Sequence, residues 1–146
     1  MDRTELAVER FASGYSCAQA VLSVFARQLG LPEEMAYKLA AGFGGGMAHL
    51  DGPCGAVTGG LMVLGMARFD PGADVRIAKS HVYTKAAEFV RMFTSHHGSI
   101  LCSRLLGCNL SRPEELRRAV EEGVIGETCP RYLRDAVALL ESLLGG

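Results

Sequence analysis

Apolar residues recur three and four positions apart along most of the chain, which is the spacing of one face of an α-helix. No segment shows the strict alternation of apolar and polar residues that indicates a half-buried β-strand. Turn residues interrupt the helical pattern at Gly30, Asp70-Pro71-Gly72 and Gly98. The pattern therefore predicts helices over residues 3–12, 17–29, 32–41, 53–68, 73–97, 99–106 and 111–122, and a last helix that begins at Pro130.

Polar residues stand at several of these helix starts. Asp2, Ser16, Ser99 and Ser111 are in N-cap positions. Ser16 and Ser111 are each followed three residues later by Gln or Glu, which is the spacing of a capping box. The sequence predicts an all-α fold: a compact multi-helix bundle of about seven or eight helices with glycine-rich connections, forming a single domain over residues 1–146.

Composition and charge narrow the classes of function. The chain has 146 residues, of which 49% are hydrophobic, so we expect a packed core rather than disorder. Lys and Arg number 15 and Asp and Glu 16, which leaves a net charge of −1. This balance gives no electrostatic footprint for nucleic acid or anionic lipid. We therefore expect no nucleic-acid partner and no binding to a membrane surface.

The start of the chain and its longest charge-free stretch bear on the compartment in which we expect the protein. The charged start, Met1 to Glu5, lacks the apolar region of a signal peptide. The charge-free stretch 52–67 is shorter than the ~20 residues that a membrane-spanning helix needs. We expect a cytoplasmic protein, whose thiols stay reduced.

Five cysteines are present, and no two of them form a C-x-x-C pair. The sequence therefore contains neither a thioredoxin-type motif nor the motif of a zinc ribbon. Cys17, Cys54, Cys102 and Cys129 each fall at the start of a predicted helix. The amides and the positive dipole end at such positions stabilise anions and lower the pKa of a thiol. Cys108 instead follows a helix end, where we expect an apolar contact. The four N-terminal cysteines predict a shared redox or metal site, and the alternative is that each only fills the core.

Glycines are concentrated next to these cysteines. The run Gly42-Phe43-Gly44-Gly45-Gly46 lacks the lysine of a phosphate-binding loop and follows a helix, so we expect a tight connection that passes close to Cys54. We expect Gly45, Gly46 and Gly55 to border a group held by the cysteines. Gly55, with Gly59 and Gly60, forms a stripe of small residues that suits either a close helix crossing or a dimer seam.

Histidines offer further candidate chemistry. His96 and His97 end the long predicted helix, where their charge interacts favourably with the helix dipole. The alternative is that one of them serves as a substitute ligand or a proton carrier near the cysteines. His49 and His81 are expected to have no special role.

Five segments carry a resemblance to a known family over nearly the whole chain. These segments are Gly14-Tyr15-Ser16-Cys17-Ala18-Gln19-Ala20, Gly42-Phe43-Gly44-Gly45-Gly46-Met47, Cys54-Gly55-Ala56-Val57-Thr58-Gly59, Ser99-Ile100-Leu101-Cys102 with Leu105-Leu106-Gly107, and Cys129-Pro130 with Leu133-Arg134-Asp135-Ala136. Together they resemble the redox-active family named for its cysteines, the C_GCAxxG_C_C family. The resemblance places the family's four cysteines on Cys17, Cys54, Cys102 and Cys129, and leaves Cys108 outside. It implies a redox protein with an iron–sulfur centre or a similar group. A related domain in split-Soret cytochromes holds a [2Fe–2S] cluster beside haem, but this chain has no C-x-x-C-H haem motif.

We therefore expect an electron-transfer or redox-sensing protein that binds one iron–sulfur cluster, with [2Fe–2S] as the favoured type, through Cys17, Cys54, Cys102 and Cys129. It would exchange electrons with a redox partner protein, and a homodimer is left open. The first alternative is a metal-free thiol–disulfide oxidoreductase that uses pairs of the same cysteines. The second is a helical interaction module whose cysteines only pack. Whether the protein is itself an enzyme or an accessory to electron transfer is left open.

Overall fold

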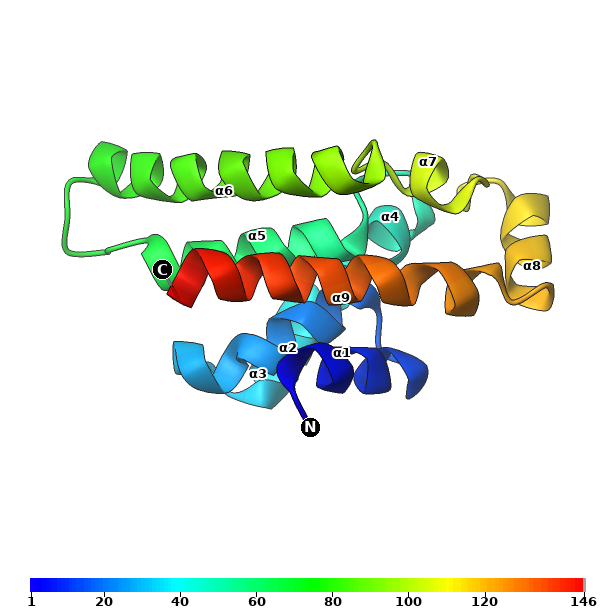
Figure 1. Ribbon diagram of the computed structural model, residues 1–146, viewed down its shortest axis with the longest axis horizontal. Coiled ribbons are helices and arrows are strands. Elements are labelled where there is room, and N and C mark those ends of the chain that lie inside the picture. The colour runs from blue at the N-terminus through cyan, green and yellow to red at the C-terminus, as the bar shows by residue number, and fades with distance from the viewer. Residues whose placement is uncertain (146) are drawn as a thin grey trace.

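The computed structural model describes residues 1–145, and these residues form helices joined by short connections, with no β-strand among them (Figure 1). The eight right-handed helices are α1 (Arg3–Ala12), α2 (Cys17–Leu29), α3 (Glu33–Ala40), α5 (Gly55–Arg68), α6 (Val75–His97), α7 (Cys102–Leu106), α8 (Pro113–Glu121) and α9 (Val124–Gly145). A short 3-10 turn, η1 (Ala41–Phe43), and a left-handed turn, α4 (Gly44–His49), connect α3 to α5. The predicted all-α class is confirmed.

The core lies where α2, α5, α6 and α9 pack together, and its largest fully buried side chains include Phe25, Phe89 and Leu133. The small-residue stripe on α5 makes this packing close. A Cβ atom on Gly59 would lie 2.9 Å from the carbonyl oxygen of Ala18 on α2, and one on Gly60 would lie 2.5 Å from the Phe89 ring on α6. The stripe therefore serves helix crossings within the chain.

Several helices begin at the predicted N-cap residues or end at the predicted glycines. The Asp2 carboxylate accepts a hydrogen bond from the Glu5 amide at 2.9 Å, and Ser16 with Gln19 forms a complete capping box at the start of α2. Gly30 and Gly98 end α2 and α6 in the left-handed conformation.

Two of the predicted caps are wrong. The Ser99 hydroxyl accepts from the Leu101 amide in a local turn, and α7 begins only at Cys102. No capping box forms at Ser111, because α8 begins at Pro113 behind Arg112, whose side chain makes no cap bond.

The start of the last helix also differs from the prediction. The helix α9 begins at Val124, and Pro130 is its seventh residue. Proline lacks the amide that would bond to the carbonyl of Gly126, so one backbone hydrogen bond is missing inside α9, but the helix does not begin there. Cys129 consequently lies in the second turn of α9, away from the helix start.

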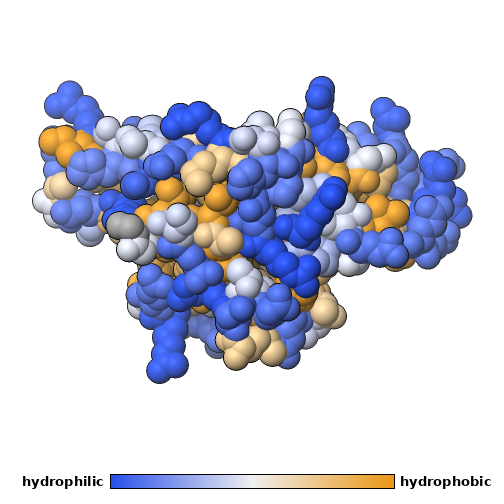
Figure 2. All heavy atoms as spheres, in the orientation of Figure 1, coloured by the Kyte–Doolittle hydropathy of each residue, from blue (hydrophilic) through white to orange (hydrophobic). Residues whose placement is uncertain are grey.

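The first half of α6 reaches beyond its neighbours. Val75 is 63% exposed, and Ile77 and Phe69 are exposed nearby. Figure 2 shows hydrophobic surface at this end of the molecule. Among residues 1–145, none of the helices has both the length and the apolar character needed to span a membrane.

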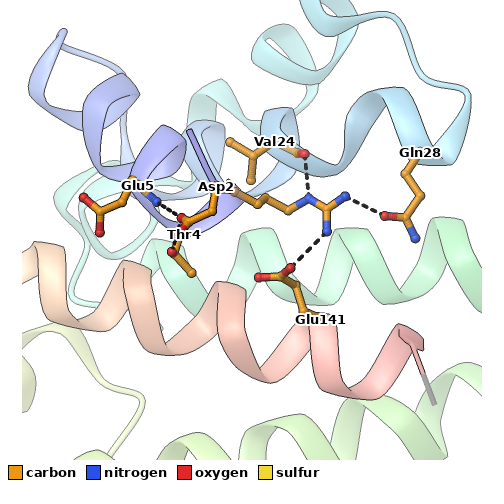
Figure 3. A network of polar contacts seen from close by, with 7 residues as sticks. Asp2, Thr4, Glu5, Val24, Gln28 and Glu141 are labelled. Atoms are coloured by element: carbon orange, nitrogen blue, oxygen red, sulfur yellow. Dashed lines mark hydrogen bonds and ion pairs between the residues drawn. The ribbon is translucent and has the colours of Figure 1, made fainter.

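Arg3 fastens the first helix to two others. Its guanidinium donates to the Val24 carbonyl at 3.1 Å and to the Gln28 side chain at 2.8 Å, and it pairs with Glu141 of α9 at 3.4 Å (Figure 3). The same group lies 4.4 Å above the centre of the Phe25 ring. These contacts hold α1, α2 and α9 together.

Candidate metal centre

The four predicted site cysteines line one cavity of about 320 Å³. They come from four separate elements: Cys17 from α2, Cys54 from the residue before α5, Cys102 from α7 and Cys129 from α9. All are free and buried, with 6–8% of their surface exposed. Cys108 is half-buried and lines a different hollow, beside α8. The fold therefore gathers the four cysteines and leaves out the fifth.

Two of these cysteines, which we call the bridge pair, are placed by backbone hydrogen bonds between two loops. The Cys54 amide donates to the Ile100 carbonyl at 2.7 Å, and the Cys102 amide donates to the Gly52 carbonyl at 3.0 Å. Between them Pro53 and Leu101 form an isolated antiparallel bridge. In Figure 1 the start of α5, the end of α6 and α7 meet at the same end of the molecule, next to α4.

A left-handed turn closes the cavity beside the bridge pair. Gly45, Gly46, Met47 and Ala48 have φ between 58° and 73°, and His49 and Asp51 also have positive φ. For residues with a Cβ atom this conformation costs about 1–2 kcal/mol each, so surrounding contacts must hold it. One such contact is the Asp51 carboxylate, which accepts from the Ser103 amide at 2.9 Å and from its hydroxyl at 3.1 Å.

The three glycines expected to border a bound group do line this cavity. Gly46 lies against the bridge pair: a Cβ atom there would be 2.7 Å from the Cβ and 3.1 Å from the Sγ of Cys102. Gly55 lies against α2, where a Cβ atom would be 3.1 Å from the Cβ of Cys17. At Gly45 it would meet the His49 ring at 2.5 Å. A side chain at any of these positions would push into the wall of the cavity.

The other two cysteines, the helix pair, are in contact with each other. Cys17 is the first residue of α2 and Cys129 the sixth of α9. A hydrogen bond between their thiols raises the pKa of Cys17 well above its ordinary value and lowers the pKa of Cys129. Burial raises the pKa of Cys17 further. The first proton therefore leaves Cys129.

Burial dominates the acidity of the bridge pair. It raises the pKa of Cys54 to about 11 and that of Cys102 to about 12. The amides of Ala56 and Val57 lower the pKa of Cys54, as expected at a helix start, but less than burial raises it. The prediction of acidic thiols at helix starts is wrong for Cys17, Cys54 and Cys102. The hydrogen bond with Cys129 is the largest cause of the raised pKa of Cys17, and removal from water outweighs the helix end at Cys54 and Cys102.

The thiols also oppose each other's ionisation. Coulombic repulsion from the neighbouring thiolates raises the pKa of Cys17, Cys54 and Cys102, and Asp51 adds to it at Cys102. Within residues 1–145, no Lys, Arg or His is among the groups that shift the pKa of the four cavity cysteines. To ionise together, the four thiols would need a cation from outside the chain to balance their negative charge.

Among residues 1–145, no three of the four sulfurs all lie within 4.8 Å of one another, whereas the ligands of one tetrahedral ion lie roughly 3.8 Å apart for ~2.3 Å metal–sulfur bonds. In the described part of the chain, the single group of three or more His, Cys, Asp or Glu residues whose ligand atoms all lie within 4.8 Å of one another is elsewhere, at His96, His97 and Asp135. The cavity suits a larger group, or separate pairs of thiols.

A family model with the description "Putative redox-active protein (C_GCAxxG_C_C)" matches residues 15–143. The chain belongs to this family. The matched region contains all four cavity cysteines and the left-handed turn, so the membership covers the whole site. Comparison with curated proteins and with solved structures finds no match.

Two residues at the mouth of the cavity were not predicted from the sequence as part of the site. His49, which was expected to have no special role, lines the cavity while its side chain is exposed. Tyr15 is 37% exposed and stacks on Tyr37, with 4.0 Å between the ring centres. No sequence signal marked His49, because it reaches the mouth through an unusual left-handed backbone.

Tyr132 is a third missed residue of the cavity wall. It is 2% exposed, and its hydroxyl donates to the Leu105 carbonyl at 2.7 Å, which joins α9 to α7. Its spacing from Cys129 could have revealed it, because residues three apart share one face of a helix.

His96 and His97 lie outside the cavity lining. Both hydrogen-bond to Asp135 of α9, at 2.8 Å and 2.7 Å. His97 contacts the cavity only indirectly, through Tyr132, with 4.9 Å between the ring centres. The geometry does not favour either histidine as a substitute ligand in the cysteine cavity.

Proposed function

We propose that this protein is a cytoplasmic electron-transfer or redox-sensing protein that holds one iron–sulfur cluster, of the [2Fe–2S] type, through Cys17, Cys54, Cys102 and Cys129. The observation that carries the proposal is the gathering of four buried thiols, from four elements, around one cavity. Membership of a family described as redox-active supports it.

The charge balance of the cavity fits such a cluster. Buried thiolates repel each other, and no Lys, Arg or His of residues 1–145 is among the groups that shift their pKa. A coordinated metal deprotonates a thiol and supplies the missing positive charge. The spread of the sulfurs favours a group larger than a single ion.

The chain's own residues would shape the properties of the centre. When bound, an iron–sulfur cluster supplies one-electron transfer at a potential set by burial and by hydrogen bonds to sulfur. The amides of Ala56 and Val57 point at the Cys54 sulfur and would stabilise its negative charge. Gly46 and Gly55 leave the backbone close to Cys102 and Cys17, with no room for a side chain between them.

A redox partner protein would approach the cavity through its mouth. His49 and Tyr15 stand there, and the left-handed turn presents Met47 and Leu50 to solvent, at 38% and 74% exposure. A thin, partly apolar rim of this kind suits the small and short-lived contacts of electron-transfer complexes.

The test is to purify the chain without oxygen and to measure iron, acid-labile sulfide and the visible spectrum. We expect brown protein with iron and sulfide in near-equal amounts, about two of each per chain. Cys54→Ser should lose most of both, whereas Cys108→Ser is the matched control and should keep them. Colourless, iron-free protein after anaerobic reconstitution would overturn the proposal.

The contact between Cys17 and Cys129 supports a second candidate, a metal-free thiol–disulfide oxidoreductase. Cys129 would be the nucleophile, because its pKa is lowered by the hydrogen bond from Cys17. Its thiolate would attack a substrate disulfide and release one substrate thiolate. Cys17, on losing its proton, would then displace the second thiolate and form the Cys17–Cys129 disulfide. Mass spectrometry of oxidised, iron-free protein would show the Cys17–Cys129 disulfide. A second experiment measures the rate at which the Cys54→Ser variant reduces a model disulfide. A rate equal to that of the wild type would favour this candidate over the cluster.

A further inference from the structure

A second group of metal-ligating side chains lies outside the cysteine cavity, where the end of α6 meets α9. Nδ1 of His96 lies 2.8 Å, and Nε2 of His97 2.7 Å, from the same oxygen, Oδ2 of Asp135. The three atoms all lie within 4.8 Å of one another.

We propose that His96, His97 and Asp135 form a binding site for a divalent first-row transition-metal ion, of which Zn²⁺ and Fe²⁺ are examples. Two imidazoles and one carboxylate suit such ions, whereas Mg²⁺ and Ca²⁺ prefer oxygen ligands throughout. Three protein ligands leave at least one coordination position for water or another ligand. On binding, the ion takes the place of the hydrogen bonds between the rings and the carboxylate: each ring gives up to solvent the proton it donates to Asp135, and binds the ion as a neutral imidazole whose one proton is on the other nitrogen.

The packing holds the ligands in place before an ion arrives. The centre of the His97 ring lies 4.5 Å from that of the Phe93 ring and 4.9 Å from that of the Tyr132 ring, to which it is nearly perpendicular. Its side chain is only 14% exposed, while that of His96 is 49% exposed. His97 and Asp135 therefore form a rigid half of the site, and His96 leaves a path for an ion from solvent.

The basic neighbours of Asp135 on its own helix are engaged elsewhere. Arg134 pairs with Glu5 of α1 at 3.2 Å, and Arg131 donates to the Tyr132 hydroxyl at 2.9 Å. The Asp135 carboxylate is thus left to the two imidazoles, and it brings one negative charge to a divalent cation.

An ion here would stabilise one wall of the cysteine cavity. It would fix the last turn of α6 on α9, immediately before the segment that leads to Cys102. It would also lie behind the ring of Tyr132, which lines the cavity on its other side. The site does not depend on the cluster, since none of its ligands is a cysteine.

The experiment follows the imidazole nitrogens of the whole chain by NMR while Zn²⁺ is added, because each histidine then reports for itself even if zinc also reaches the thiols. We expect Nδ1 of His96 and Nε2 of His97 to shift together, while the signals of His49 and His81 stay in place. Mg²⁺ at the same concentration should shift none of them. Unmoved signals of His96 and His97 would overturn the proposal and leave a hydrogen-bonded clamp between two helices.

Substitutions separate metal binding from folding. His96→Gln changes the most exposed ligand, and Asp135→Asn keeps the shape of the side chain while it removes the charge. Each should weaken zinc binding at this site by at least the ~10–100-fold that the loss of an outer-shell partner costs. His81→Gln, on the exposed face of the same helix, is the matched control and should bind zinc as the wild type does. Unchanged affinity in Asp135→Asn would contradict the site, whatever the result for iron in the cysteine cavity.

Discussion

The helix pair and the bridge pair of cysteines reach the same cavity by different means. Cys17 and Cys129 are carried by long helices, which the apolar core and the Arg3 contacts hold in place. Cys54 and Cys102 are placed by a single antiparallel bridge between two loops and by a left-handed turn beside them. The comparison indicates that the packing of the helix bundle places the helix pair, whereas irregular backbone places the bridge pair.

This difference sets where the site is most easily damaged. A core helix distributes its stability over many apolar contacts, so one altered contact moves its residues little. The left-handed turn is instead a set of unfavourable conformations that a few hydrogen bonds hold in place. We therefore expect the largest effects of substitution beside the bridge pair.

The first prediction concerns Gly46→Ala. The new Cβ atom would lie 2.7 Å from the Cβ of Cys102, and φ at this residue is +73°. Overpacking of about 1–3 kcal/mol and backbone strain of about 1–2 kcal/mol should together lower the free energy of unfolding by roughly 2–5 kcal/mol. Urea unfolding of the iron-free chain measures the loss, and we expect the iron content of the reconstituted protein to fall with it.

Gly30→Ala is the control for this prediction. Gly30 has the same φ, +73°, and no atom lies within 4 Å of its would-be Cβ. It should therefore lose only the strain, about 1–2 kcal/mol. Equal losses in the two variants would mean that contact with Cys102 does not matter and that the bridge pair tolerates displacement.

The second prediction tests the link between the two pairs. Tyr132→Phe removes the hydroxyl that joins α9, the helix of Cys129, to the Leu105 carbonyl of α7, the helix of Cys102. A buried carbonyl left without a donor should cost about 1–3 kcal/mol in the free energy of unfolding. Tyr83→Phe, at a tyrosine of α6 that is 63% exposed, should change it by less than about 0.5 kcal/mol. If the two variants unfold at the same urea concentration, this hydrogen bond does not join the pairs.

The sequence predicted the surroundings of Cys17 better than those of the bridge pair. The Ser16 capping box depends on residues three apart, so local pattern was enough to place Cys17 at the first turn of α2. The left-handed turn could not be predicted, because Met47, Ala48 and His49 ordinarily avoid positive φ and only long-range contacts such as Asp51 with Ser103 hold them there.

Two errors came from rules applied without tertiary context. Pro130 was interpreted as a helix start, although α9 already begins six residues earlier, at Val124. The thiols were expected to be acidic because they stand at helix ends, but acidity depends on burial that only the folded chain reveals. Family resemblance identified the four cysteines without either argument.

The third prediction contrasts the acidity of Cys129 with that of the bridge pair in iron-free protein. Burial raises the pKa of Cys54 to about 11 and that of Cys102 to about 12, against an ordinary value near 9.0. Raised thiol pKa values mean that the unfolded chain loses these protons first, so stability should fall as pH rises from about 9 to 11. Cys129, whose pKa is lowered, should instead be the first of the four to react with iodoacetamide as pH is raised.

Two measurements check this contrast. Urea midpoints between pH 8 and 10 should fall less for Cys54→Ser than for the wild type, because one of the thiols with a raised pKa is gone. Mass spectrometry of partly alkylated protein should find the label on Cys129 before Cys54 and Cys102, all three being similarly buried. Equal labelling of Cys129, Cys54 and Cys102 would contradict the difference in acidity.

The smallest effect is expected at Cys108, which belongs to neither pair. It lies six residues after Cys102, half-buried beside α8 and outside the cavity. Cys108→Ser should change the free energy of unfolding by no more than about 0.5 kcal/mol, as most substitutions away from special features do. The same substitution at Cys102 should remove a thiol from the cavity wall and, with it, most of the bound iron. If Cys108→Ser lost iron as Cys102→Ser does, the site would extend beyond the two pairs and proximity to the cavity would not define its ligands.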